Sequence, residues 1–139
     1  MKQETVLIIE DNEQNRYLVR FLLEQHGYRV VVASDGASGI EAARNVRPDL
    51  ILLDIQLPLL DGYAVARAIR ETESLRDIPI VAVTSYAMVG DREKCMAVGC
   101  NGYIEKPINP ETFVSEIAGF LKPSLEDEGE LHETHPDRR

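Results

Sequence analysis

The feature that most constrains this chain is a regular alternation between short, continuous apolar runs and longer stretches with helical periodicity. The runs lack a polar residue at every second position, which is typical of strands buried on both faces of a parallel sheet. Five runs are present: Val6–Ile9, Val30–Ala33, Leu50–Leu53, Ile80–Val83 and a short one at Gly102–Ile104. Because each run precedes a helical pattern, the sequence predicts an α/β fold, a three-layer, doubly wound (βα)5 parallel sheet with helices on both faces.

Cap and stop residues mark the expected helices. The first is expected to end at Gly27, the second to open at Asp35 and stop before Pro48, the fourth to span Asp91 to Val98, and the fifth to use Asn109 as cap with Pro110 in its first turn. Helical spacing predicts the inward-facing residues of the first, second, third and fifth helices. In that order they are Leu18, Phe21, Leu22 and Gln25; Ala37, Ile40, Ala43 and Val46; Ala64, Val65, Ala68 and Ile69; Phe113, Ile117 and Phe120.

Length and charge divide the chain into a body and a tail. The 139 residues suit one compact domain, expected at residues 1–122. The net charge of −9 argues against a nucleic-acid partner, whose phosphates favour a basic surface. From Pro123 onward there are six acidic residues, two arginines and only Leu125 and Leu131 as aliphatic side chains. Burial there is too small to offset the ordering entropy, so residues 123–139 are expected to be an acidic, disordered tail.

The apolar segments are too short for a membrane span. The longest unbroken aliphatic run before an acidic residue, Leu50–Leu53, is far below the ~20 residues that a span needs. The first four residues, Met1 to Glu4, lack the apolar stretch of a signal peptide, so a cytoplasmic protein without membrane contact is expected. Cys95 and Cys100 are expected to be reduced, partly buried thiols.

Residues that could carry chemistry lie at or just past the ends of four of the five apolar runs. Glu10 and Asp11 follow the first, Asp54 the third, Thr84 the fourth, and Lys106 lies just past the fifth. In an open parallel sheet, ligands bind beyond the carboxyl ends of the strands. The topology therefore brings three carboxylates, one hydroxyl and one ammonium to the same edge.

This combination predicts a divalent cation and phosphoryl chemistry. Two carboxylates 4 Å apart repel by about 4 kcal/mol at an effective dielectric of 20, and one lysine cannot balance three of them. With oxygen ligands and no histidine nearby, Mg²⁺ or Mn²⁺ is favoured over zinc. Asp54 is the candidate nucleophile because carboxylates form aspartyl phosphates. The metal, Lys106 and the Thr84 hydroxyl would each take a phosphoryl oxygen.

The motifs resemble those of the receiver domains of two-component response regulators. They are LIIEDN at residues 7–12, LILLDIQLPLLDG at 50–62, VAVTSYA at 81–87 and GYIEKP at 102–107. The resemblance runs from about Lys2 to Leu121 and is strongest to small, bacterial, single-domain regulators of the cell-polarity type. It implies a flavodoxin-like sheet with strand order 2-1-3-4-5. It also implies a phosphorelay protein that takes its phosphoryl group from a sensor histidine kinase or a histidine phosphotransfer protein.

The resemblance also assigns roles at the site. It implies that Asp11, Asp54 and the backbone carbonyl of Gln56 ligate Mg²⁺ directly, with Glu10 acting largely through water. Glu10 departs from the commonest pattern, which has Asp there. The resemblance further suggests a cis peptide bond between Lys106 and Pro107, which would aim the lysine into the pocket.

The family's switch couples Thr84 to an aromatic side chain, here Tyr103. After phosphorylation of Asp54, Thr84 would move towards the phosphoryl group and Tyr103 would turn inward, reporting to a downstream protein at the face formed by the fourth helix, fifth strand and fifth helix. Gln56 and Tyr86 would tune the lifetime of the phosphoryl group. The small Ser85 would leave room for it.

The prediction is therefore a phosphorylatable switch that is not an enzyme in its own right. Two other functions are alternatives to it. A haloacid dehalogenase-type phosphatase also uses an aspartyl nucleophile, but it needs a second Asp where this chain has Gln56, and its nucleophile lies on the first strand. A pseudo-receiver would serve only as an interaction module, but it would lack Asp54, Thr84 or Lys106. The chain is either a stand-alone regulator, which the initial Met and the tail favour, or a receiver excised from a hybrid kinase.

Overall fold

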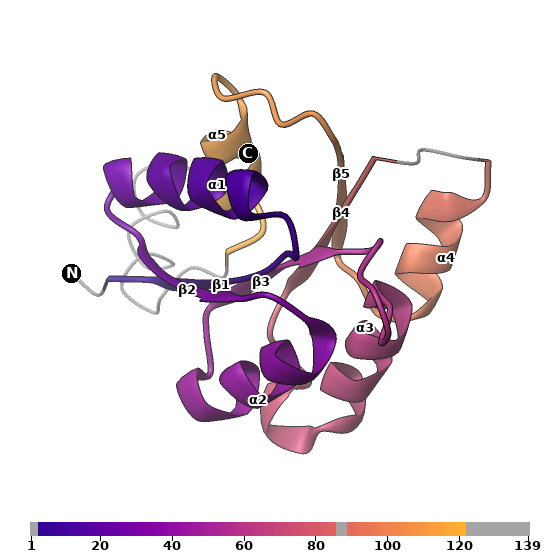
Figure 1. Cartoon of the computed structure of the whole chain (residues 1–139). Coiled ribbons are helices and arrows are strands. Elements are labelled where there is room, and N and C mark those ends of the chain that lie inside the picture. Colours follow the sequence, from indigo (N-terminus) through magenta and orange to yellow (C-terminus); the bar gives the residue numbers. More distant parts are fainter. Residues whose placement is uncertain (1–2, 86–88, 122–139) are drawn as a thin grey trace, which may run out of the picture.

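Within the described part of the chain, five strands alternate with five α-helices (Figure 1). The computed structural model describes residues 3–85 and 89–121. The strands are β1 (Thr5–Ile9), β2 (Arg29–Ala33), β3 (Leu50–Asp54), β4 (Ile80–Thr84) and β5 (Gly102–Glu105). The helices are α1 (Glu13–Gln25), α2 (Gly36–Val46), α3 (Gly62–Glu71), the 3-10 turn η1 (Glu73–Leu75), α4 (Asp91–Ala97) and α5 (Phe113–Ala118). The expected tail at 123–139 and the domain boundary at 122 lie outside the described residues.

All strands are parallel and lie in the order β2-β1-β3-β4-β5. Helices α1 and α5 lie on one side of the sheet, and α2 and α3 lie on the other (Figure 1). The α/β class, the layers and the strand order 2-1-3-4-5 are therefore confirmed. Asp54 pairs with Val83 and Thr84 with Glu105, so the carboxyl ends of the three strands β3, β4 and β5 meet at one edge.

The continuous apolar runs are explained by two cores, one on each face of the sheet. Successive side chains of a strand point to opposite faces. In β1, Val6 and Ile8 pack with α1 and α5, whereas Leu7 and Ile9 pack with α2, α3 and α4. The strands β3 and β4 divide in the same way. Both faces of these strands exclude water, so the runs between their polar ends carry apolar side chains at every position.

The expected inward face of α1 is wrong. Val19 and Leu23 are the buried residues of this helix, and Leu22 packs partly against the same core. Phe21 is 47% exposed, and Gln25 is exposed. Apolar residues occupy nearly every position from 18 to 23, so periodicity leaves several faces possible. The position of α1 over the sheet decides among them.

Two further helices differ in detail from the expectation. In α2, Ala37 is exposed, and Gly39 faces the sheet so closely that a Cβ there would lie 2.6 Å from Ile9 Cδ1. α5 begins at Phe113, not directly after Asn109. The Asn109 side chain accepts a hydrogen bond from the Glu111 amide at 3.0 Å and so caps a turn that precedes the helix. The inward placement of Phe113 and Ile117 is confirmed.

Arg70, near the end of α3, joins the loops at the amino edge of the sheet. Its guanidinium donates to the carbonyls of Gly99, Arg76 and Ile78 at 2.9 to 3.0 Å and to Asn101 Oδ1 at 2.7 Å. A guanidinium presents five donors in a rigid fork, which suits this set of acceptors. One side chain therefore ties together the loops that precede β4 and β5.

The described helices are all too short or too polar to cross a lipid bilayer. Cys95, on α4, and Cys100 are buried free thiols, as expected, and both pack in the core that α2 and α3 also cover. Burial raises the pKa of the Cys100 thiol to about 12, so this thiol stays protonated near neutral pH.

Candidate functional site

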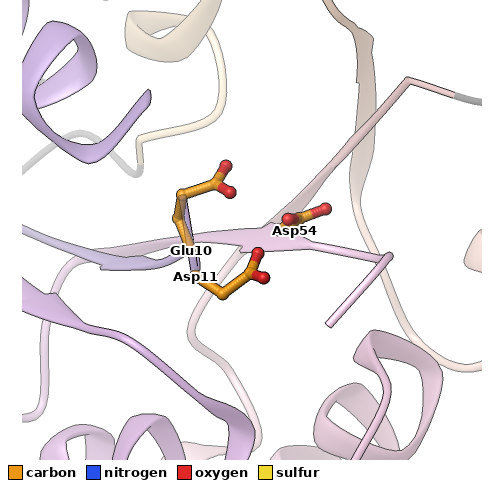
Figure 2. Close-up of side chains that lie close together, drawn as sticks. All are labelled: Glu10, Asp11 and Asp54. Atoms are coloured by element: carbon orange, nitrogen blue, oxygen red, sulfur yellow. The ribbon is translucent and has the colours of Figure 1, made fainter. Parts of the chain in front are cut away.

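The three acidic residues meet at the carboxyl edge of the sheet. Glu10 and Asp11 follow β1 directly, and Asp54 is the last residue of β3. One carboxylate oxygen from each lies within 4.8 Å of the others, and the side chains point towards a common space (Figure 2). Glu10 and Asp54 are buried, with exposed fractions of 5% and 3%, whereas Asp11 is exposed to solvent. The structure therefore brings these three residues together at the sheet edge, where the topology predicted them.

Short hydrogen-bonded turns fix the backbone around Glu10. The Asn12 side chain caps α1 by accepting from the Asn15 amide at 2.9 Å. The Asn12 amide donates to Glu10 Oε2 at 3.1 Å, and Arg16 Nη1 donates to the Glu10 carbonyl at 2.8 Å. The start of α1 therefore holds the Glu10 carboxylate at the sheet edge.

Close backbone packing fixes Asp54. The Gln56 amide donates to Asp54 Oδ1 at 2.9 Å, and the Gly62 amide donates to the Ile55 carbonyl at 3.1 Å. A Cβ at Gly62 would lie 2.6 Å from Ile55 Cα and 2.7 Å from the Asp54 carbonyl oxygen. Only glycine therefore lets the start of α3 approach β3 at this point.

Lys106 is the cation of this site. Its Nζ lies 2.9 Å from Glu10 Oε1 and 3.5 Å from Asp54 Oδ2. The Lys106–Pro107 peptide bond is cis, as expected. The ammonium is mostly buried and contacts two of the three carboxylates, so the site keeps an excess of negative charge.

The pKa of Glu10 is raised from 4.5 to about 7. Burial is the largest cause, and the neighbouring Asp54 also raises it, whereas Lys106 opposes the shift. The ionised form of Glu10 lacks the solvation that water would give it, and the Lys106 ammonium balances this loss only in part. A divalent cation would supply that balance, and the donors are carboxylate oxygens, which Mg²⁺ prefers.

Thr84 lies at the end of β4 with its side chain fully buried. The Lys106 amide donates to its carbonyl at 2.8 Å, which links the lysine to this strand. The Gln56 side chain donates from Nε2 to Thr84 Oγ1 and accepts from the Ser85 amide at 3.1 Å. Sequence reasoning missed this link because it joins the loop after β3 to the end of β4, 28 residues further along the chain.

Tyr103 is half-buried on β5, with its hydroxyl donating to Asp91 Oδ2 at 2.8 Å. The Tyr63 hydroxyl, from α3, donates to the other oxygen of Asp91. The Arg92 guanidinium lies 5.9 Å from the centroid of the Tyr103 ring. Asp91 and Tyr63 have no signal in a single sequence that could have marked them as partners of Tyr103. Tyr86 lies outside the described residues.

A surface hollow of about 680 Å³ lies beside Tyr103, over α4, β5 and α5. Its lining includes Arg92, Ile104 and Phe120 together with polar residues of α5. The hollow lies on the face that the resemblance assigns to a downstream protein.

The comparisons with known proteins agree with this geometry. The profile of the response regulator receiver domain matches residues 6–118. The chain is 43% identical over 118 residues to the polar-differentiation response regulator DivK of Brucella anthropi, an alignment that covers 85% of this chain and 96% of DivK.

Two solved structures extend this similarity. The first is the receiver domain of the sensor histidine kinase PA1611 of Pseudomonas aeruginosa, described with a magnesium ion coordinated in its active-site cleft. It is 37% identical, with a TM-score of 0.79, and 86% of this chain and 98% of that chain are covered. The second is a chain of the complex between the Saccharomyces cerevisiae phosphotransfer protein Ypd1 and the receiver domain of Ssk1. It has a TM-score of 0.79 at 29% identity, with 85% and 88% covered.

The family match spans most of the chain, and it agrees with the fold and with the acidic edge built here from β1 and β3. The resemblance read from the four motifs is thereby confirmed. The chain belongs to the response regulator receiver domain family, the signalling domain of two-component systems.

Proposed function

We propose that Asp54 accepts a phosphoryl group from a phosphohistidine and so switches this protein between two signalling states. The observation that carries the proposal is the arrangement of charges around Asp54. Its buried carboxylate lies beside Glu10 and Asp11, and the Lys106 ammonium lies 3.5 Å from Asp54 Oδ2. A buried nucleophile with nearby cationic charge is what phosphoryl transfer requires.

A bound Mg²⁺ fits the donors at this edge, and Mn²⁺ fits them too. Asp11, Asp54 and the backbone carbonyl of Gln56 would hold the ion directly, and Glu10 would act largely through water. The ion would neutralise charge on the phosphoryl oxygens. The support is the convergence of three carboxylate oxygens within 4.8 Å and the raised pKa of Glu10.

The chain's own groups define the transfer step. A carboxylate oxygen of Asp54 attacks phosphorus in line, a P–O bond forms, and the P–N bond to the donor imidazole breaks with its electron pair staying on the imidazole. The Lys106 ammonium stabilises one phosphoryl oxygen, and the Thr84 hydroxyl donates to another. Ser85, next to Thr84, is small enough to leave space for the incoming group.

The phosphorylated state would be reported through Tyr103. Thr84 would turn towards the phosphoryl group, and Tyr103 would leave Asp91 and turn inward. The hollow beside Tyr103 would change shape in response. Its position over α4, β5 and α5 supports a downstream protein partner at this face. Gln56 and Tyr86 would tune how long the phosphoryl group lasts.

Receiver domains interact with histidine kinases or with phosphotransfer proteins, as in the complex of Ypd1 with Ssk1. For this chain we propose a cytoplasmic location and a sensor histidine kinase or histidine phosphotransfer protein as donor, with no nucleic-acid or membrane partner. The net charge of −9 supports a protein partner over a polyanion.

The experiment that tests this function is phosphorylation by acetyl phosphate with Mg²⁺, followed by intact-protein mass spectrometry. The wild-type protein should gain the mass of one phosphoryl group, and Asp54→Asn should gain none. Asp77→Asn, at an exposed aspartate near η1, is a matched control that should label like the wild type. No mass gain in the wild type would refute the switch and favour a pseudo-receiver.

A second assay on the wild-type protein distinguishes a phosphorylatable switch from a phosphatase. A haloacid dehalogenase-type phosphatase would hydrolyse a generic phosphate monoester over many turnovers. A phosphoacceptor should show a single labelling event per molecule and only slow release of phosphate. The position where the phosphatase needs its second Asp is Gln56, whose side chain here bonds Thr84 and Ser85.

A further inference from the structure

The Asp91 carboxylate, at the start of α4, accepts hydrogen bonds from two tyrosines that lie on other elements. Tyr63 of α3 donates to Oδ1, and Tyr103 of β5 donates to Oδ2 at 2.8 Å. Both hydroxyls keep their protons near neutral pH, because burial and the adjacent Asp91 carboxylate raise the pKa of each phenol. One side chain therefore joins three elements that are separate in the sequence: α3, α4 and β5.

Two cations of α4 lie against the same two rings. Lys94 Nζ is 4.3 Å from the centroid of the Tyr63 ring. The Arg92 guanidinium is 5.9 Å from the centroid of the Tyr103 ring. α4 spans seven residues and its buried residue is Cys95, so the apolar burial by this helix is small. The hydrogen bonds of its first residue therefore contribute much to the position of α4 against α3 and β5.

We propose that Asp91 is a positioning residue that holds Tyr103 in the position seen here and so opposes the phosphorylated state. The inference rests on the proposed function, in which Tyr103 turns inward when Asp54 carries a phosphoryl group. That movement breaks the hydrogen bond between Tyr103 and Asp91, so this bond stabilises the unphosphorylated state relative to the phosphorylated one. Asp91 acts through Tyr103 and has no part in holding the metal or the phosphoryl group.

The second tyrosine keeps the cost of this movement moderate. A partly buried carboxylate that is left without a donor loses the free energy of its solvation. When Tyr103 leaves, Tyr63 still donates to Asp91, so the carboxylate keeps a partner. The movement then costs one partly buried hydrogen bond to a charged group, which shifts the equilibrium between the two positions of Tyr103 by about ten-fold.

The test is the affinity for beryllium fluoride, a phosphoryl mimic that is not hydrolysed, measured with Mg²⁺ present. A ligand binds less tightly when its competent state is only partly populated, so Asp91→Ala should tighten binding by about ten-fold. Asp91→Asn keeps the shape of the side chain but loses its charge, and it should tighten binding by about three-fold. Glu93→Ala is the matched control, because it removes the other acidic residue in the first turn of α4 at an exposed position, and it should bind like the wild type.

Two further measurements separate positioning from a general effect on the fold. In a Tyr103→Phe background, which lacks the hydroxyl, Asp91→Ala should change the affinity little. In NMR spectra recorded without the mimic, Asp91→Ala should move the Tyr103 ring signal towards its position in the wild-type protein saturated with the mimic. Glu93→Ala should leave this signal in place. A purely structural role for Asp91 would predict weaker binding and no such shift.

Unchanged or weaker binding in both Asp91 variants would overturn the inference. So would an equal gain in the Tyr103→Phe background, or a Tyr103 signal that stays in place in Asp91→Ala. Failure of the wild-type protein to bind the mimic or to accept a phosphoryl group from acetyl phosphate would instead refute the proposed function.

Discussion

Replacement of Glu10 by glutamine tests the electrostatics of the site without a phosphoryl donor. The folded state raises the pKa of Glu10 from 4.5 to about 7, so the folded protein binds this proton more tightly than the unfolded chain. Stability is therefore lost as the pH rises from 4.5 through about 7, because ionisation then costs more in the folded state. Between pH 5 and pH 8 the wild type should lose about 2 to 3 kcal/mol relative to Glu10→Gln, at ~1.4 kcal/mol per pKa unit.

The assay is urea unfolding at pH 5 and pH 8 in the presence of a chelator, followed by circular dichroism because the chain has no tryptophan. Glu41→Gln, at an exposed position of α2, is the control and should follow the wild type at both pH values. Saturating Mg²⁺ at pH 8 should remove the wild type's disadvantage, because the ion favours the ionised carboxylate. A difference between wild type and Glu10→Gln that is the same at both pH values would refute the reasoning.

Three further substitutions test other parts of the structure. Asp11→Ala should raise the Mg²⁺ concentration needed for half-maximal labelling by at least ten-fold, and an unchanged titration would contradict its role as a ligand. Arg70→Ala should lower the free energy of unfolding in urea by about 2 kcal/mol, since it removes the hydrogen bonds that join the partly buried and exposed loops before β4 and β5, whereas exposed Arg67→Ala should change it little. Gly62→Ala should cost about 2 kcal/mol or more in thermal unfolding, because its Cβ would meet the backbone of β3, whereas Gly119→Ala should be nearly neutral.

Helical periodicity in the sequence was not sufficient to predict which face of each helix packs against the sheet. In α1, Leu18, Val19, Phe21, Leu22 and Leu23 are all apolar, so the helical pattern accommodates more than one inward face. The structure buries Val19 and Leu23 and leaves Phe21 47% exposed, next to Tyr17 with the ring centroids 6.3 Å apart. In α5 the pattern was sharper, with Val114 as the single apolar residue between Phe113 and Ile117, and the inward placement of Phe113 and Ile117 was confirmed.

The sequence by itself determined the fold class and the residues of the acidic edge. Continuous apolar runs specify strands covered on both faces, and the rule that parallel strands end at one edge then places Glu10, Asp11, Asp54, Thr84 and Lys106 together. Only the tertiary structure decided how these residues are partnered. The contacts of Gln56 with Thr84, and of Asp91 with Tyr63 and Tyr103, join loops and helices far apart in the chain. Local patterns do not encode such contacts, because they depend on how closely separate βα units approach once the sheet has formed.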